Sequence, residues 1–487
     1  MLFKNKFWTK PTNEGNLFLK IFFFSILLIF VILGYLTTHN LIVAFIMIGS
    51  VLSIWLAYYY PILTIVLLIL FGQIIQFELI DFLASFDALP LGGLSLRFSD
   101  PIIFGIIVAI LIKIIKVDPA LKRIVLGKGK YFTIFLFFVL FQVIRNYSIY
   151  GSYSFGEFRT YYQGFLIIPY VAMSINNSKM RKRLFVILVI LALSQIITAL
   201  IKGAFIQNFS LDTYEKWLSS FGSLALLYGL FGLYLYRKYK GAKLQKISTF
   251  IIIFSGIIIL IIASNRSVWL AGIVAFLFLI ITKEIKVKHH VALFLISIFV
   301  FLLVTQVFTS EGYDFYNFFT QRFYAFTDFK KDPTAAWRYY VWMSMIENIA
   351  AQPFWGYGLG GNFNFFIPEF ASFFGNSPHN FYLAMMYELG FIGLSLFFIF
   401  LINFILDLKG LKFLNITDHI IRLNSYIVIV SFLSYWIAYS TEKDFFTWAF
   451  LGLGFSIIIN TSFGHINSKN QIQNSASLTE QNQIEVN

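Results

Sequence analysis

The sequence predicts an all-α polytopic integral membrane protein with about 14 transmembrane helices and one large loop. Hydrophobic residues make up 59% of its 487 residues and charged residues only 12%, whereas a soluble domain carries about 25% charged residues. Apolar runs long enough to cross a bilayer recur from Leu17 to Asn460. The turns between them alternate between rich and poor in Lys and Arg, as expected for a chain that crosses a membrane repeatedly.

The apolar runs divide the chain into predicted spans with soft boundaries. The two runs beside Tyr60-Pro61 form either two spans or one broken helix. Because the other boundaries are soft as well, the predicted count is about 14, within a range of 12–14. The spans are placed near residues 17–36, 41–58, 61–77, 100–116, 131–147, 158–175, 184–201, 218–236, 247–263, 267–282, 291–308, 379–406, 423–440 and 444–460.

The charges of the turns predict a single orientation. Cytoplasmic turns of membrane proteins carry an excess of Lys and Arg, and here the N-terminus and every second turn are basic. The intervening turn at residues 77–99 instead holds three carboxylates and one arginine, Arg97. Both termini are therefore predicted in the cytoplasm. The formal net charge of +14 then reflects topology rather than a nucleic-acid partner.

This topology divides the chain into four segments. Residues 1–308 form an N-terminal transmembrane bundle, and residues 309–378 form one large loop on the exterior side. Residues 379–460 form the C-terminal transmembrane helices. The tail at residues 461–487 is rich in Asn, Gln and Ser, and this composition predicts a disordered cytoplasmic segment.

The large loop contains a predicted amphipathic helix. Asp332 and Pro333 suit the start of a helix, because a carboxylate caps it and proline fits its first position. Over residues 334–350, apolar side chains recur on one stripe, formed by Trp337, Val341, Met345 and Ile349. We expect this helix to lie at the outer boundary between membrane and water.

Three arginines and one histidine are predicted at the exterior ends of spans or in the loop: Arg159, Arg266, Arg338 and His379. Several guanidinium groups could hold a pyrophosphate without a metal ion. His379 follows a proline at the start of a span, and a neutral histidine there is a natural general base. The plainer alternatives are that each arginine is an interfacial anchor and that the histidine caps or packs.

Other features restrict the chemistry. The chain has no cysteine, which excludes disulfides, thiol nucleophiles and zinc–thiolate sites. The carboxylates of Glu442 and Asp444 lie in one short turn and form a poor metal site, so we expect no metal and no cofactor. The glycine run of Gly356, Gly358 and Gly360 follows no predicted strand, which argues against nucleotide binding. We expect this loop to approach a bulky substrate closely.

The segment from Arg338 to Gly393 resembles the O-antigen ligase and polymerase family. Gln352 stands where the family has asparagine, and the turn at residues 264–271 resembles the family's Ser-Arg-Gly-x-Trp-Leu-Ala with one inserted residue. Together these motifs cover about 130 residues, from Arg266 onward. The matching residues are Arg338 and Trp342, Gln352-Pro353, Gly356-x-Gly358-x-Gly360, His379-Asn380-Phe381-Tyr382-Leu383 and Glu388-x-Gly390-x-x-Gly393.

The resemblance implies a GT-C-like glycosyltransferase of the bacterial inner (cytoplasmic) membrane, with its active site facing the periplasm. It implies a polyprenyl (undecaprenyl) pyrophosphate-linked glycan as donor, for O-antigen, lipopolysaccharide or other surface polysaccharide biosynthesis. The acceptor is either lipid A-core, as for a ligase, or the next repeat unit, as for a polymerase. By resemblance, Arg266 holds the pyrophosphate and His379 activates the acceptor hydroxyl. Position alone adds Arg159 and Arg338 as further ligands, and Asn380 as a residue that orients the histidine ring or a sugar.

Two questions stay open from the sequence. Ligase and polymerase share the loop motifs, so the motifs do not separate them. The rival class is a transporter or flippase of the same lipid-linked glycan, which needs polar groups through the bilayer core. The predicted spans offer little beyond Glu388, which either acts in function or pairs with a loop group.

Overall fold

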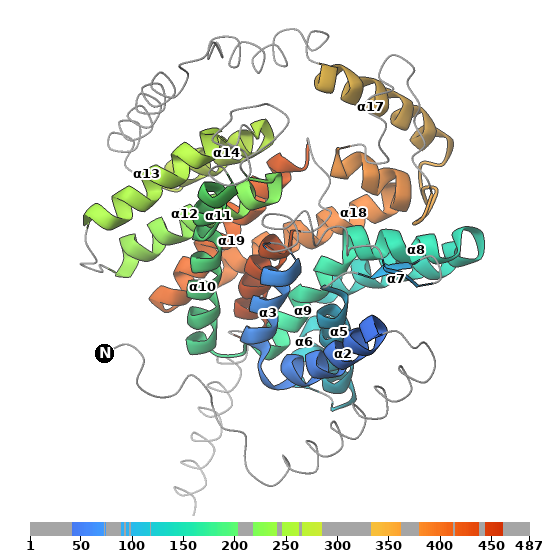
Figure 1. The fold of residues 1–487 in the computed structure, drawn as a ribbon, viewed down its shortest axis with the longest axis horizontal. Coiled ribbons are helices and arrows are strands. Elements are labelled where there is room, and N and C mark those ends of the chain that lie inside the picture. The colour runs from blue at the N-terminus through green and yellow to red at the C-terminus, as the bar shows by residue number, and fades with distance from the viewer. Residues whose placement is uncertain are drawn as a thin grey trace, which may run out of the picture.

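The computed structural model describes residues 41–72, 74, 89–91, 94–96, 99–116, 118–202, 218–240, 246–262, 265–284, 333–361, 379–412, 414–437 and 444–460 (Figure 1). The predicted spans at 17–36 and 291–308, the tail at 461–487 and the loop residues 309–332 and 362–378 lie outside the described residues.

The described residues are helical apart from turns and one short hairpin. In the hairpin, β1 (Leu89–Leu91) pairs antiparallel with β2 (Leu94–Leu96). The helices are α2 (Leu41–Tyr59), α3 (Pro61–Ile69), α5 (Ser99–Ile115), α6 (Pro119–Val125), α7 (Lys130–Tyr150), α8 (Ser152–Glu157), η3 (Phe158–Tyr162), η4 (Gln163–Leu166), α9 (Ile167–Ser174), α10 (Ser178–Leu193), α11 (Gln195–Ile201), α12 (Ser220–Lys240), α13 (Lys246–Ile262), α14 (Arg266–Ile281), α17 (Pro333–Ala351), α18 (Phe381–Gly410), α19 (Ile416–Tyr435) and the C-terminal helix Phe445–Asn460.

The helices support a membrane protein. Four helices in the described part of the chain are long and apolar enough to cross a bilayer, namely Lys130–Tyr150, Ser178–Ile201, Phe381–Gly410 and Ile416–Tyr435. Shorter apolar helices accompany them, and large apolar side chains point outward, with Ile115 and Ile144 exposed by 79% and 74%. Such exposure suits a surface in contact with lipid. The count of about 14 spans stays a prediction.

The chain breaks at Tyr60 between α2 and α3, which agrees with both sequence alternatives, two spans or one broken helix. Tyr60 has φ −128° and ψ 61°, outside the helical region, and Pro61 begins α3. Proline fits the first position of a helix because its missing N–H has no intrahelical acceptor there.

The C-terminal helix Phe445–Asn460 lies in the middle of the described bundle (Figure 1). Almost every residue of this helix is buried, including Phe446, Trp448 and Leu453. Trp448 packs against Phe165 of η4 and Phe432 of α19. A run that reads as an ordinary lipid-facing span is therefore a central packing element, since both types of helix are apolar all round.

A buried ion pair joins α10 to α19. The Arg181 guanidinium donates two hydrogen bonds of 2.8 Å to the carboxylate of Asp418, and the two side chains are only 5% and 2% exposed. Asn415 donates to the same carboxylate. Arg181 belongs to a turn whose charge predicted orientation, but its side chain also fixes the packing of two helices through a bidentate contact.

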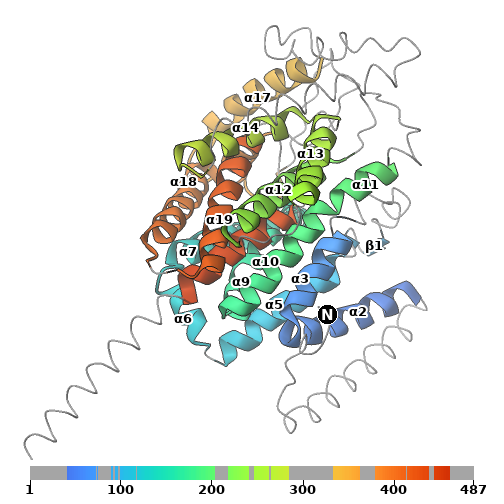
Figure 2. The ribbon, with the colours of Figure 1, turned by 90° about the vertical axis from the view of Figure 1, so that its left-hand side faces the viewer.

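The amphipathic helix of the loop is present as α17. Its predicted stripe, Trp337, Val341, Met345 and Ile349, is buried, whereas Tyr339 on another face is 44% exposed. Met345 and Ile349 form a small hydrophobic cluster with Ala384 and Tyr387 of α18, separate from the main core. Figure 2 places α17 at the end of the molecule opposite α6. Its position at the outer membrane boundary stays a prediction.

Candidate functional site

The glycine run and the Glu-x-Gly-x-x-Gly motif form one structural unit. At Gly390 the backbone of α18 leaves the helical region, with φ 64° and ψ −171°. Residues 353–358 pair with the backbone on both sides of Gly390 through four hydrogen bonds. Tyr357 N donates to Tyr387 O at 2.7 Å and Gly358 N to Glu388 O at 3.0 Å, while Phe391 N donates to Pro353 O at 2.7 Å and Ile392 N to Phe354 O at 3.2 Å. The kink is therefore stabilised because its freed backbone groups find partners.

The glycines of the run approach the protein itself. Gly356, Gly358 and Gly360 all have positive φ, at 66°, 94° and 94°. A Cβ on Gly358 would overlap the Asn146 amide, and one on Gly360 would lie 2.9 Å from Ser154 N. We expected the run to lie close to a substrate. In the structure, the absence of side chains lets the loop pack against α7, α8 and α18, and its approach to a substrate stays a prediction.

Side chains of α7 and α8 hold the loop from the other side. Tyr150 Oη donates to Tyr357 O at 3.2 Å, Ser154 Oγ to Leu359 O at 2.9 Å, and Gln142 Nε2 to Trp355 O at 3.3 Å. These bonds satisfy carbonyls that the irregular backbone leaves without helical partners. The loop is thus a fixed scaffold between α7 and α18.

His379 and Asn380 lie at the start of α18. Asn380 Oδ1 accepts a hydrogen bond from Leu383 N at 3.1 Å, so Asn380 is the N-cap of the helix, and its role toward the ring or a sugar stays a prediction. His379 adopts a left-handed conformation with φ 47°. Its ring meets the edge of Trp337 on α17, with ring centroids 5.5 Å apart and planes at 68°. The loop helix therefore packs directly on the predicted base.

Arg266 is the first residue of α14, and Asn265 before it is 1% exposed. Asn265 Nδ2 donates to Ser223 Oγ at 2.8 Å, and Ser220 Oγ donates to Asn265 Oδ1 at 3.1 Å. The start of α14 is thereby fastened to the start of α12. Two helix N-termini, each with a positive dipole end, lie side by side next to Arg266.

Contacts at the end of α19 connect this pair of helix starts to His379. The Phe221 ring of α12 packs against Tyr435, the last residue of α19. The next residue, Trp436, accepts through its carbonyl a hydrogen bond of 3.1 Å from Phe381 N. The starts of α12, α14 and α18 therefore lie at one end of the bundle. The structure brings the backbone of Arg266 and the His379 segment to that common end.

Arg338 and Arg159 are placed differently. Arg338 is half-buried on α17, next to Trp337, and so belongs to the His379 end. Arg159 lies in the π-helix η3 and forms an ion pair with Asp100 of α5 at 3.2 Å. Tyr162, in the same π-helix, donates to Glu388 Oε2 at 2.7 Å, so η3, which carries Arg159, contacts the α18 kink.

Arg145 is a residue that the sequence analysis missed. It lies near the C-terminal end of α7, with its guanidinium 5.7 Å from the ring centroid of Trp355, just before the glycine run, and it donates to Gln142 Oε1 at 3.2 Å. The signal was available, because Arg145 lies at the predicted exterior end of the span at 131–147. Position at the exterior end of a span, the feature that singles out Arg159, applies equally to Arg145.

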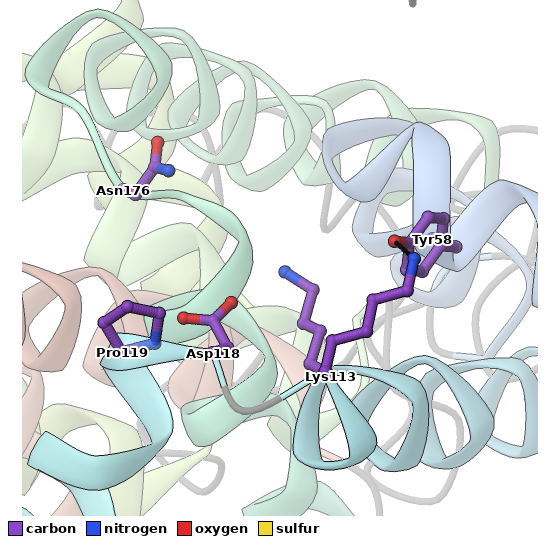
Figure 3. A pocket seen from close by; sticks show the side chains of 6 residues that line it. Tyr58, Lys113, Asp118, Pro119 and Asn176 are labelled. Carbon is purple, nitrogen blue, oxygen red and sulfur yellow. Dashed lines mark hydrogen bonds between the residues drawn. The ribbon is translucent and has the colours of Figure 1, made fainter. Parts of the chain in front are cut away.

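A cavity of about 530 Å³ lies apart from these residues (Figure 3). It is lined by Tyr58, Lys113, Lys116, Asp118, Pro119 and Asn176. Both lysines are engaged, since Lys113 donates to Met173 O at 3.0 Å and Lys116 to Tyr58 Oη at 2.6 Å. These contacts lie near the C-terminal ends of α9 and α2 and suit lysines that balance helix dipoles. In the described residues, no group of three or more His, Asp or Glu could hold a metal ion.

Comparison with known proteins bears on the same residues. The O-antigen ligase family model matches residues 249–398. This range contains Arg266, α17, the glycine run, His379 and the α18 kink. No curated protein matches the chain. The match over residues 249–398, on a chain of apolar helices, supports a membrane protein related to the O-antigen ligase and polymerase family.

Proposed function

We propose that this protein acts in membrane glycan assembly as a glycosyltransferase, moving a glycan from polyprenyl pyrophosphate to an acceptor sugar. The observation that carries the proposal is the common end of α12, α14 and α18, where the Arg266 backbone and His379 lie within the range of the family match. A cationic site and a base are the two groups that such a transfer needs.

Arg266 and Arg338 are proposed to bind the pyrophosphate. Guanidinium groups match phosphate oxygens in pairs, and the N-termini of α12 and α14 add donors and positive potential. Asp100 already balances the charge of Arg159, so we expect Arg159 to contribute least among the three. This set of charges stabilises the leaving group without requiring a metal ion.

His379 is proposed to act as the general base. The acceptor hydroxyl attacks the anomeric carbon of the glycan, the bond from that carbon to the pyrophosphate oxygen breaks, and polyprenyl pyrophosphate leaves. The hydroxyl proton passes to the imidazole. Trp337 and Asn380 support this role, because one packs on the ring and the other caps the helix that carries it.

The proposed active face is the periplasmic side of the inner membrane, because the basic turns predict the opposite side as cytoplasmic. The absence of native cysteine makes this directly testable with single cysteines. In intact spheroplasts, Tyr153→Cys in α8 should react with a membrane-impermeant maleimide. Leu126→Cys, at the end of α6, should react only after permeabilisation. Both positions are exposed, by 67% and 72%, and the reverse pattern would invert the proposed face.

The function itself is tested with the purified protein in detergent, a polyprenyl pyrophosphate-linked glycan as donor and a choice of acceptors. Transfer to lipid A-core indicates a ligase, and extension of a second lipid-linked repeat unit indicates a polymerase. Release of polyprenyl pyrophosphate should accompany either transfer in equal amount. Glycan that crosses the bilayer of a proteoliposome without being transferred would instead establish the flippase alternative.

A further inference from the structure

A buried polar contact joins the α18 kink to the π-helix η3. Glu388, in the middle of an apolar helix, is 1% exposed, and its Oε2 accepts a hydrogen bond of 2.7 Å from Tyr162 Oη. Tyr162 is equally buried and is the last residue of η3. Single π-helical turns are frequent at functional sites.

Stability alone does not account for this carboxyl group. A buried ionisable residue in an apolar span is costly. In addition, Glu388 Oε1 has no hydrogen-bond partner among the described residues. An unsatisfied buried oxygen costs about 1–3 kcal/mol. Glu388 is therefore a candidate for a functional role.

Glu388 connects three elements at one point. Its side chain meets η3, and its backbone carbonyl accepts from Gly358 N in the glycine run. It also lies two residues before the break at Gly390, at the C-terminal end of the short half-helix Phe381–Leu389. His379 lies just before the N-terminal end of that half-helix. A rotation or shift of the C-terminal end of this half-helix therefore also moves His379.

The half-helix Phe381–Leu389 packs on two sides, and its residues Phe381, Met385 and Leu389 belong to the main core. With α17 it shares the small cluster of Met345, Ile349, Ala384 and Tyr387, which is separate from the main core. The rings of Tyr357 and Tyr387 stack at 4.6 Å. The contact between Glu388 and Tyr162 therefore adds a directional polar contact with η3 to the apolar packing of this half-helix between α17 and the main core.

We propose that Glu388 is a positioning residue that acts through Tyr162. Together they set the rotation and depth of the half-helix Phe381–Leu389, and thereby the place of His379 relative to the pyrophosphate site. This inference rests on the proposed function of His379, whereas the geometric coupling itself does not depend on it.

Three variants test the contact through kinetics. Tyr162→Phe removes the donor and Glu388→Leu removes the acceptor, while Glu388→Gln keeps an oxygen that can accept from Tyr162. A misplacement of about 1 Å can cost ~10²-fold. We therefore expect kcat to fall about 10- to 100-fold in the first two variants, with the KM for the lipid-linked donor unchanged. Glu388→Gln should stay near wild type, as should Ile402→Ala, an exposed control on the same helix.

A loss in Glu388→Gln as large as in Glu388→Leu would overturn the proposal, because it would make Glu388 itself a titrating group. An unchanged kcat in Tyr162→Phe would also overturn it. The pH profile of kcat should keep its shape in every variant. If the melting temperature falls in every variant in which kcat falls, Glu388 has a merely structural role and the proposal is overturned.

A distance measurement separates this inference from the proposed function. Spin labels at Tyr339→Cys on α17 and Tyr153→Cys on α8, both exposed, report the position of α17, which packs on the half-helix, in a chain without other cysteines. Their distance distribution should shift or broaden in Tyr162→Phe and Glu388→Leu but not in Glu388→Gln. An unchanged distribution contradicts the positioning role. Absence of transfer by the wild-type protein contradicts only the proposed function.

Discussion

Replacing His379 with asparagine should abolish glycan transfer while leaving binding of the lipid-linked donor intact. A sugar hydroxyl is a poor nucleophile, and a positioned base contributes ~10²–10⁴-fold to the rate. Donor binding is assigned to the arginines, so the KM for the donor should change little. The measurement is the rate of transfer from a purified lipid-linked glycan to the acceptor in detergent.

Asparagine is chosen instead of alanine so that backbone strain at position 379 does not add to the effect of losing the imidazole. His379 has φ 47°, and asparagine tolerates the left-handed region better than alanine does. If His379→Ala is inactive but His379→Asn is not, backbone strain rather than a lost base explains the effect. A near-normal rate for His379→Asn refutes the base.

Arg266→Lys provides the contrasting variant. It keeps the positive charge but loses the paired geometry of the guanidinium group. Loss of two charge-assisted hydrogen bonds corresponds to roughly 2–4 kcal/mol. We expect this loss to appear mainly in donor binding, whereas His379→Asn affects the chemical step. Full activity of Arg266→Ala would reduce Arg266 to an interfacial anchor.

The second large effect is expected for Gly358→Ala, which should destabilise the loop and abolish transfer. Gly358 has φ 94°, and a Cβ there would overlap the amide of Asn146 in α7. Overpacking costs about 1–3 kcal/mol, and the left-handed conformation adds roughly 1–2 kcal/mol for a residue with a Cβ. The melting temperature in detergent should fall clearly, together with activity.

Gly361→Ala is the matched control in the same loop. The nearest atom to its added Cβ is Gly358 O at 3.3 Å, and Gly361 is not among the glycines with positive φ. It should therefore be much milder than Gly358→Ala. Adding Asn146→Ala to Gly358→Ala should recover part of the stability by removing the overlapping amide, although the strain in φ remains. Equal stability of the Gly358→Ala and Gly361→Ala variants would contradict this account of the loop.

Local patterns were enough to predict where most of the described helices lie. The stripe of Trp337, Val341, Met345 and Ile349 predicted an amphipathic helix at the membrane boundary, and in α17 this stripe is buried within the protein. Apolar runs likewise predicted the helices that became α7, α12 and α18. These features depend on residues within a few turns of one another, so a single segment carries the whole signal.

Motif spacing also identified the segment that contains the candidate site. The residues around Arg266 and from Arg338 to Gly393 indicated the O-antigen ligase and polymerase family, and the family match covers residues 249–398. The roles of Arg266, Arg338 and His379 stay proposals.

Only the tertiary structure decided which polar groups meet and which apolar helix is central. The pairing of Arg159 with Asp100, of Arg181 with Asp418 and of Glu388 with Tyr162 joins residues far apart in the chain. The same holds for the hydrogen bonds by which the segment from Pro353 to Gly358 pairs with the kink at Gly390. The physical reason is that the type of a side chain, apolar or polar, does not indicate which distant residue it will contact. Burial in lipid and burial in protein demand the same apolar composition, whereas hydrogen bonds between distant segments depend on a packing that local sequence does not encode.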